Sequence, residues 1–136
     1  MQIRQTNQVF NFDKYPTFEK DIDLKQRAWI EVKGKAIETN VRQLRSRLSK
    51  DCQFMAVVKA DGYGHDAKLV SEYAIRGGAS QLGVATLSEG IELRSSGVTK
   101  PILILGNLYT KRDLILAFKN DLMPTISSIR ECLICN

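Results

Sequence analysis

The sequence has no long apolar run, and this absence excludes a membrane span. None of its 136 residues lies in a stretch approaching the roughly 18 apolar residues that a membrane-spanning helix needs. Residues 1–25 are polar and contain no apolar core of a secretory signal. Cysteine is scarce as well, because Cys52, Cys132 and Cys135 are an odd number that cannot pair completely. Together these absences predict a cytoplasmic protein.

Runs of like charge are also absent. The 20 lysines and arginines outnumber the 15 aspartates and glutamates, for a formal net charge of +5, but they are scattered. No aromatic residues alternate with them, as a groove for single-stranded nucleic acid requires. We therefore interpret them as solvated helix faces and expect no nucleic-acid partner; a basic patch for an anionic ligand or nucleic acid is the alternative.

Metal ligands are few. Cys132 and Cys135 form a single C-x-x-C pair, whereas a zinc site needs four ligands and usually a second pair. Their spacing within a helical segment favours burial instead. We expect no metal site.

What is present is a regular succession of apolar strands and helices. Four apolar runs begin near residues 54, 81, 101 and 123, and a helix signal follows each. Continuous apolar runs are typical of parallel strands buried on both faces. The pattern predicts an α/β fold with about four β-α units, either doubly wound or a barrel. A complete barrel needs roughly 250 residues, so the barrel interpretation requires an incomplete chain.

Two regions precede these units. Residues 1–26 have weak periodicity and are expected to form an irregular extension, and Trp29–Val32 alternates as a short strand. A helix is predicted after Gly34, where Glu38 and Arg42 are spaced as an ion pair that we expect on its exposed side. Its apolar stripe consists of Ile37, Val41, Leu44 and Leu48. Capping-box spacings, which we interpret as structural, start three later helices at Thr86/Glu89, Thr110/Asp113 and Ser128/Glu131.

The most informative stretch surrounds Lys59. This lysine closes an apolar strand, and a turn containing Gly62, Tyr63, Gly64 and the only histidine, His65, follows it. In α/β barrels, active sites gather at the carboxyl ends of the strands. Apolar neighbours would disfavour the ammonium form and leave a nucleophilic amine, as a Schiff-base lysine requires. The Tyr63 hydroxyl could donate to a phosphate.

Simpler explanations exist for the same residues. Lys59 could leave the sheet and extend into water. His65 is more often a hydrogen-bonded structural residue. On the residues alone, both explanations of Lys59 stay open.

The segment Ala56–His65, AVVKADGYGH, is very similar to the lysine signature of alanine racemases, which use pyridoxal 5′-phosphate (PLP). The similarity extends over about residues 27–130, and Asp61, Gly62 and Asp66 are small departures from the family pattern. Further matching segments are Trp29–Val32, Gly77–Ala79, Gly83–Thr86 with Glu89, and Pro101–Gly106.

The resemblance implies that residues 34–136 are the N-terminal portion of a PLP-binding (β/α)8 TIM-type barrel. It also implies that the strand in residues 27–33 joins a β-domain built mostly from the C-terminal half. Lys59 would be the catalytic residue that holds PLP, Tyr63 would bind its phosphate, and Leu105 would be an apolar neighbour of the cofactor.

The function implied by the resemblance is the interconversion of L-alanine and D-alanine for peptidoglycan precursors, in a cytoplasmic homodimer. The family's second base, a tyrosine, and its arginine at the pyridine nitrogen have no counterpart here, and Tyr109 does not take the tyrosine's role. We therefore expect the 136 residues alone to be an incomplete, inactive fragment. The alternatives are a non-enzymatic PLP-binding homeostasis protein of the related barrel family and a decarboxylase on the same kind of barrel.

Overall fold

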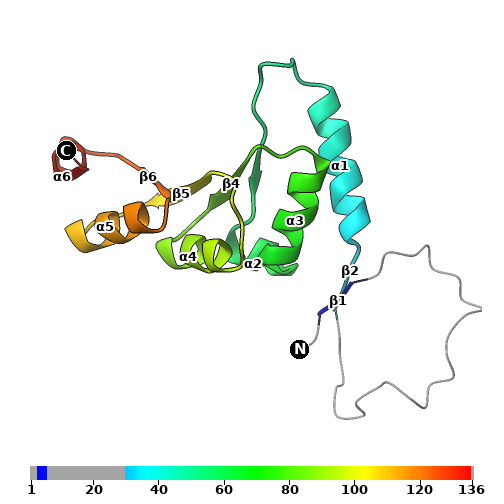
Figure 1. Cartoon of the computed structure of the whole chain (residues 1–136), viewed down its shortest axis with the longest axis horizontal. Helices are drawn as coiled ribbons and strands as arrows, with labels where there is room; N and C mark the ends of the chain where they lie inside the picture. The colour runs from blue at the N-terminus through cyan, green and yellow to red at the C-terminus, as the bar shows by residue number, and fades with distance from the viewer. Residues whose placement is uncertain (1–2, 6–29, 136) are drawn as a thin grey trace, which may run out of the picture.

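The computed structural model describes residues 3–5 and 30–135 (Figure 1). Its strands form two sheets, and within each sheet neighbouring strands run parallel. The small sheet pairs β1 (Ile3–Gln5) with β2 (Ile30–Val32). The main sheet contains β3 (Met55–Val57), β4 (Gln81–Val84), β5 (Ile102–Asn107) and β6 (Met123–Thr125). The helices are α1 (Gly34–Ser46), α2 (Lys59–Gly64), α3 (Ala67–Gly77), α4 (Leu87–Ser95), α5 (Lys111–Lys119) and α6 (Ile129–Cys135).

The order of the strands decides between the two folds that the sequence pattern left open. The main sheet runs β3-β4-β5-β6, so each strand pairs in parallel with the next one along the chain. A doubly wound sheet reverses its order at a switch point, whereas a barrel adds each strand beside the last. The predicted α/β fold is confirmed, and its strand order is that of part of a barrel.

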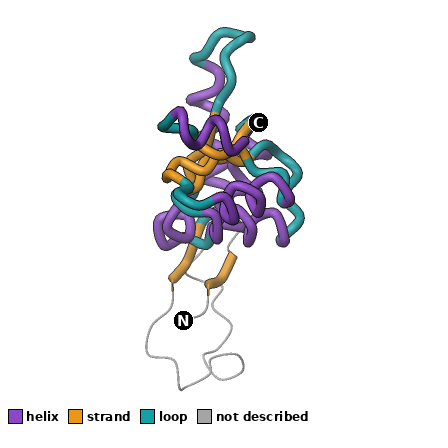
Figure 2. The backbone as a smooth tube through the Cα atoms, turned by 90° about the vertical axis from the view of Figure 1, so that its left-hand side faces the viewer, coloured by secondary structure: helices purple, strands orange, loops and turns teal. Residues whose placement is uncertain are grey.

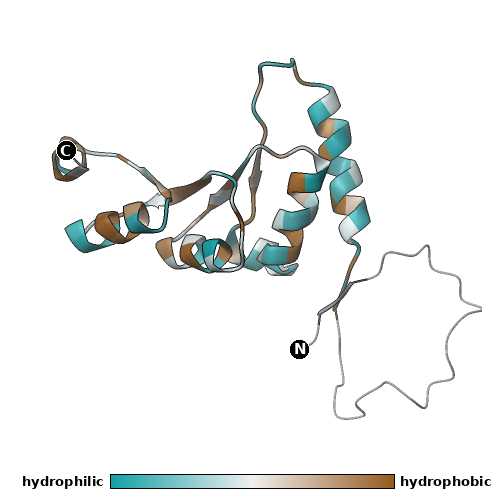
Figure 3. Ribbon diagram, in the orientation of Figure 1, coloured by the Kyte–Doolittle hydropathy of each residue, from teal (hydrophilic) through white to brown (hydrophobic). Residues whose placement is uncertain are grey.

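The main core lies between this sheet and the helices on one of its faces. Helices α4 and α5 lie side by side there, and residues of α3 pack against the same core (Figures 1 and 2). Buried residues of the core include Leu82, Val84, Leu93, Ile102, Ile104 and Leu114. The opposite face is open among the described residues, where Val57, Leu105 and Met123 are exposed. Figure 3 shows that β5, at the centre of the sheet, is largely hydrophobic. The expectation of strands buried on both faces is thus met on the helix side alone.

Helix α1 packs against α3 through a face that differs from the predicted one. The buried residues of α1 are Gly34, Glu38 and Val41. Leu44 is 53% exposed and Leu48 is exposed as well. The predicted stripe is therefore wrong in its second half, and the prediction that Glu38 lies on the exposed side is wrong.

Close approach of the two helices at glycines explains this difference. A Cβ on Gly34 would lie 2.1 Å from the ring of Tyr73, and a Cβ on Gly77 would lie 2.7 Å from the main-chain oxygen of Glu38. The helices meet where a side chain is missing. The pattern of apolar residues in the sequence does not predict a helix contact that is made at glycines. Glu38 is buried because α1 and α3 lie so close together there.

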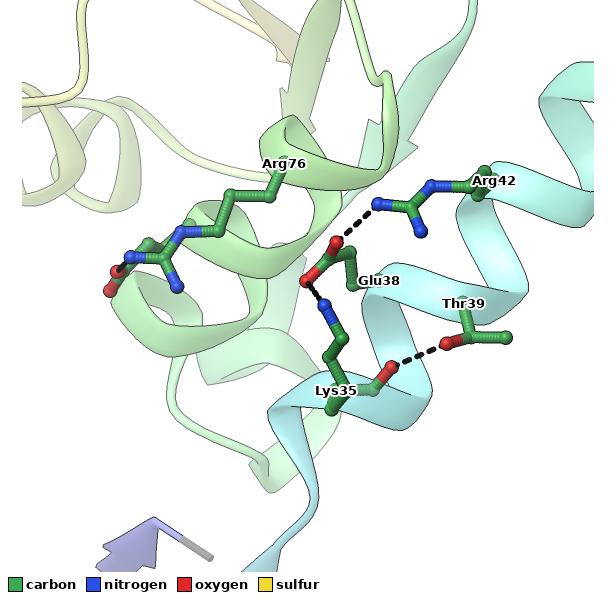
Figure 4. Close-up of polar contacts among 6 residues, drawn as sticks. Lys35, Glu38, Thr39, Arg42 and Arg76 are labelled. Atoms are coloured by element: carbon green, nitrogen blue, oxygen red, sulfur yellow. Dashed lines mark hydrogen bonds and ion pairs between the residues drawn. The ribbon is translucent and has the colours of Figure 1, made fainter. Parts of the chain in front are cut away.

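Glu38 is only 6% exposed and keeps two cationic partners from its own helix (Figure 4). Lys35 Nζ donates to Glu38 Oε2 at 2.9 Å, and Arg42 donates to Oε1, which confirms the predicted pair. The hydrogen bond from Lys35, with the charges of both cations, holds the pKa of Glu38 below its usual value although burial opposes this.

The predicted helix starts are confirmed. Thr86 and Glu89 form a reciprocal capping box at α4, and Thr110 accepts a hydrogen bond from the Asp113 main chain at α5. At α6, Ser128 Oγ accepts from the Glu131 main chain at 3.2 Å. Local spacing was sufficient to predict each of them because a cap involves residues of one turn.

The description does not cover all of the predicted N-terminal elements. Trp29 and residues 6–26 fall outside it, and β1 is the one element described within the predicted extension. Among the described residues, no helix combines the length and apolarity needed to cross a bilayer. Nor do these residues bring together three acidic, histidine or cysteine side chains that could hold a metal ion.

The burial predicted for the cysteine pair is wrong for Cys132, whose thiol is free and exposed. Helix α6 packs through Glu131 and Ile134, which lie three residues apart on one face. Cys132 lies beside that face.

Candidate cofactor site at the carboxyl ends of the strands

Lys59 lies at the carboxyl end of β3, two residues after the strand ends at Val57. It is therefore the first residue of α2 and not the last residue of the strand. Its side chain is partly buried and makes no hydrogen bond or ion pair with any other residue that the structure describes. The amine is available for a ligand.

The turn that follows Lys59 is left-handed. Ala60, Asp61, Gly62 and Tyr63 all have φ between 51° and 61°. This conformation costs a residue other than glycine roughly 1–2 kcal/mol. Only Gly62 adopts it without that cost, so the other three need support from surrounding groups. A glycine-containing turn was predicted, but its extent was not.

Two aspartates join this turn to α3. Asp61 Oδ1 accepts from the main-chain N–H of Ala67 at 2.8 Å, and Asp66 Oδ1 accepts from that of Leu69 at 3.0 Å as the N-cap. These are two of the positions that depart from the family pattern, and both have a structural use here. His65 Nδ1 lies 2.9 Å from the Tyr63 carbonyl oxygen, so the hydrogen-bonded structural role predicted for it is confirmed.

A third carboxylate reaches the turn from α4, and sequence reasoning missed it. Glu89 Oε1 accepts from the Ala60 N–H at 2.8 Å. Glu89 Oε2 accepts from Ala85 N–H at 2.7 Å and Thr86 N–H at 3.2 Å. The capping-box spacing predicted the bond from Thr86 N–H alone. The bond to Ala60 joins residues 29 positions apart, and no local pattern signals it.

The other two predicted site residues, Tyr63 and Leu105, lie in different parts of the fold. Tyr63 lies on the same turn as Lys59, is 58% exposed, and its hydroxyl bonds to no other described residue. Leu105 lies two strands away, within β5 and not at its end. A Cβ on Gly83 would lie 3.4 Å from Val57 and 3.5 Å from Leu105, so these two side chains flank Gly83 on the open face.

The chemistry of these groups fits PLP. Its aldehyde needs a free primary amine, which Lys59 offers. Its phosphate needs a hydrogen-bond donor, and the Tyr63 hydroxyl is free to donate. A Cβ on Gly64 would meet nothing within 4 Å, so the backbone beside Tyr63 is open to a ligand.

Comparison with known proteins gives one consistent result. A model of the family "Alanine racemase, N-terminal domain" matches residues 32–135. The chain is 56% identical over 115 residues to an alanine racemase of Prochlorococcus marinus, covering 85% of the chain and 30% of the relative. An alanine racemase of Nostoc sp. is 49% identical over 109 residues, 80% of the chain and 28% of the relative. The chain thus spans less than a third of the length of these relatives.

Solved structures agree. The alanine racemase of E. faecalis superposes with a TM-score of 0.71 at 38% identity, over 75% of this chain and 27% of that one. The Bacillus anthracis enzyme, solved with bound L-Ala-P, has a TM-score of 0.69 at 36% identity over the same shares. Because the family model covers most of the chain and the strand order and motif agree with it, this chain belongs to the alanine racemase family, in its N-terminal domain.

Proposed function

We propose that the protein to which these residues belong is a PLP-dependent alanine racemase, with Lys59 as its cofactor lysine. The observation that carries the proposal is the position of Lys59 at the carboxyl edge of the sheet, inside the family's signature, with an amine that bonds to no other described residue. Support also comes from the alanine racemases that the chain resembles. Among related structures, one holds L-Ala-P and another, from Clostridium difficile, is in complex with cycloserine, which suits alanine as the substrate.

Each predicted site residue has a distinct task in this proposal. PLP, when bound, supplies an electron sink for the substrate α-carbon. Lys59 Nζ would hold the cofactor through its aldehyde carbon and would release it to the amino group of the substrate. As a free amine it would then take or return the α-proton on one face of the substrate. The Tyr63 hydroxyl donates to the phosphate, and Leu105 forms an apolar wall on the open face of the sheet. Racemisation needs a second base on the opposite face, which we assign to residues outside this chain.

The proposal extends to the organisation of the whole protein. Residues 34–136 would form part of the barrel, with residues 27–33 reaching a β-domain and residues 1–26 preceding both. We further propose a homodimer that works in the cytoplasm and supplies D-alanine for peptidoglycan. Free, exposed thiols at Cys52 and Cys132 suit a reducing compartment.

The test is racemisation by the full-length protein. Incubated with PLP and L-alanine, it should form D-alanine, measured through a coupled D-amino-acid oxidase reaction. PLP binding without D-alanine would favour the non-enzymatic PLP-binding alternative. Release of carbon dioxide from the amino acid would favour the decarboxylase.

Tyr63→Phe in the full-length protein should raise the dissociation constant for PLP about tenfold. The expected effect is that of losing one hydrogen bond to a charged group, about 1–2 kcal/mol. Titration of the apo-protein with PLP, followed by its absorbance, measures it. Tyr109→Phe is the matched control, since Tyr109 is 80% exposed and lies outside the signature. An unchanged constant for Tyr63→Phe would mean that this tyrosine only packs.

A further inference from the structure

We propose that Glu89 is a positioning residue for Lys59, an inference that rests on the proposed function of that lysine. Glu89 is the first acidic residue of α4 and is only partly exposed. Its carboxylate joins the turn after β3 to the turn after β4 through three main-chain N–H groups. None of its hydrogen bonds to described residues involves the Lys59 side chain, so it would act through the backbone.

The bonded N–H group explains how the effect reaches Lys59. The N–H of Ala60 belongs to the peptide unit that also contains the Lys59 carbonyl. A hydrogen bond that fixes this peptide plane restricts two backbone angles, the ψ of Lys59 and the φ of Ala60. The φ of Ala60 is 51°. Ala60 adopts this value at a cost, so without an acceptor for its N–H the backbone would relax towards the right-handed region. The direction in which the Lys59 side chain leaves the turn would change with it.

Both carboxylate oxygens are in use, and this makes a carboxylate necessary. Oε1 serves Ala60 alone, while Oε2 serves Ala85 and Thr86. Glutamine is also found at this capping-box position, but it has one accepting oxygen and an amide group that only donates. Glu89→Gln can therefore keep the cap of α4 or the bond to Ala60, but not both. At the start of α6, by contrast, the cap bonds of Glu131 stay local, with Ser127 and Ser128.

The experiment compares Glu89→Gln with Thr86→Ala in the full-length protein. Thr86→Ala is the matched control, because it removes the hydroxyl that caps Glu89 N–H and leaves the carboxylate in place. Hydrogen exchange of the Ala60 amide should become on the order of tenfold faster in Glu89→Gln and stay unchanged in Thr86→Ala. The amides of Leu82 and Val84 in β4 should exchange as in the wild type in both variants.

Cofactor and kinetic measurements then connect the turn to Lys59. In Glu89→Gln the dissociation constant for PLP should rise about tenfold, and kcat should fall with the KM for alanine little changed. If Glu89→Gln does not fold, Glu89→Asp takes its place, because the shorter side chain keeps a carboxylate at the helix start without spanning to Ala60.

Three results would overturn the inference. The first is unchanged Ala60 exchange in the Glu89 variant, and the second is equal acceleration at Ala60 and in β4. The third is faster exchange at Ala60 with PLP affinity and kcat unaltered, which would make the bond purely structural. A wild-type protein that binds no PLP would instead refute the proposed function, and it would be recognised before any variant is made.

Discussion

Lys59→Ala in the full-length protein is expected to abolish covalent PLP binding and racemisation together. Lys59 is the only lysine among the described residues that lies within two residues after the end of a main-sheet strand, and its amine has no partner among these residues. Without a primary amine at that position, no bond to the cofactor aldehyde can form. The visible absorbance of lysine-bound PLP should therefore disappear, and D-alanine formation should fall to background.

Borohydride reduction of the wild-type protein, followed by peptide mapping, identifies the lysine directly. The pyridoxyl group should lie on the peptide that contains Lys59. Lys68→Ala is a suitable control, because Lys68 is an exposed residue of α3. Finding the label on Lys68 or Lys100 would overturn the assignment.

A polypeptide made of residues 1–136 and nothing more is expected to produce no D-alanine. In this part of the protein β3 and β6 each pair with one neighbour, so each leaves a row of unpaired backbone groups. The open face exposes Val57, Leu105 and Met123. A barrel closes such edges and fills such a face, and the second base would be missing as well.

We expect this polypeptide to aggregate readily and to bind PLP weakly through Lys59 at best. The coupled D-amino-acid oxidase assay decides the matter, with the full-length protein as the positive control. Robust turnover, with contaminating full-length enzyme excluded by mass spectrometry, would contradict this expectation. It would show that residues 1–136 are sufficient for racemisation.

How much of the site could be predicted depends on how far apart its contacts lie in the chain. Lys59, Tyr63 and the glycines are close in sequence, and one motif contains them all. Leu105 was assigned by resemblance, and the structure places it on the face that carries Val57. Glu89 was predicted to cap a helix and was counted among the residues that match the family. Its bond to Ala60 could not be predicted, because it depends on how α4 lies against the Lys59 turn.

The sequence by itself determined the succession of strands and helices and their caps, and its signature motif singled out Lys59 as the proposed cofactor lysine. Apolar runs, capping spacings and a signature are properties of neighbouring residues, so they can be read without knowing what packs where. Only the tertiary structure decided the strand order, the burial of Glu38 and the exposure of Leu44. It alone also showed the left-handed turn with its acceptor from α4. These features depend on which surfaces of the molecule meet. The close approach of α1 and α3 at Gly34 and Gly77 buries Glu38, whose charge is paired, and leaves Leu44 exposed to water.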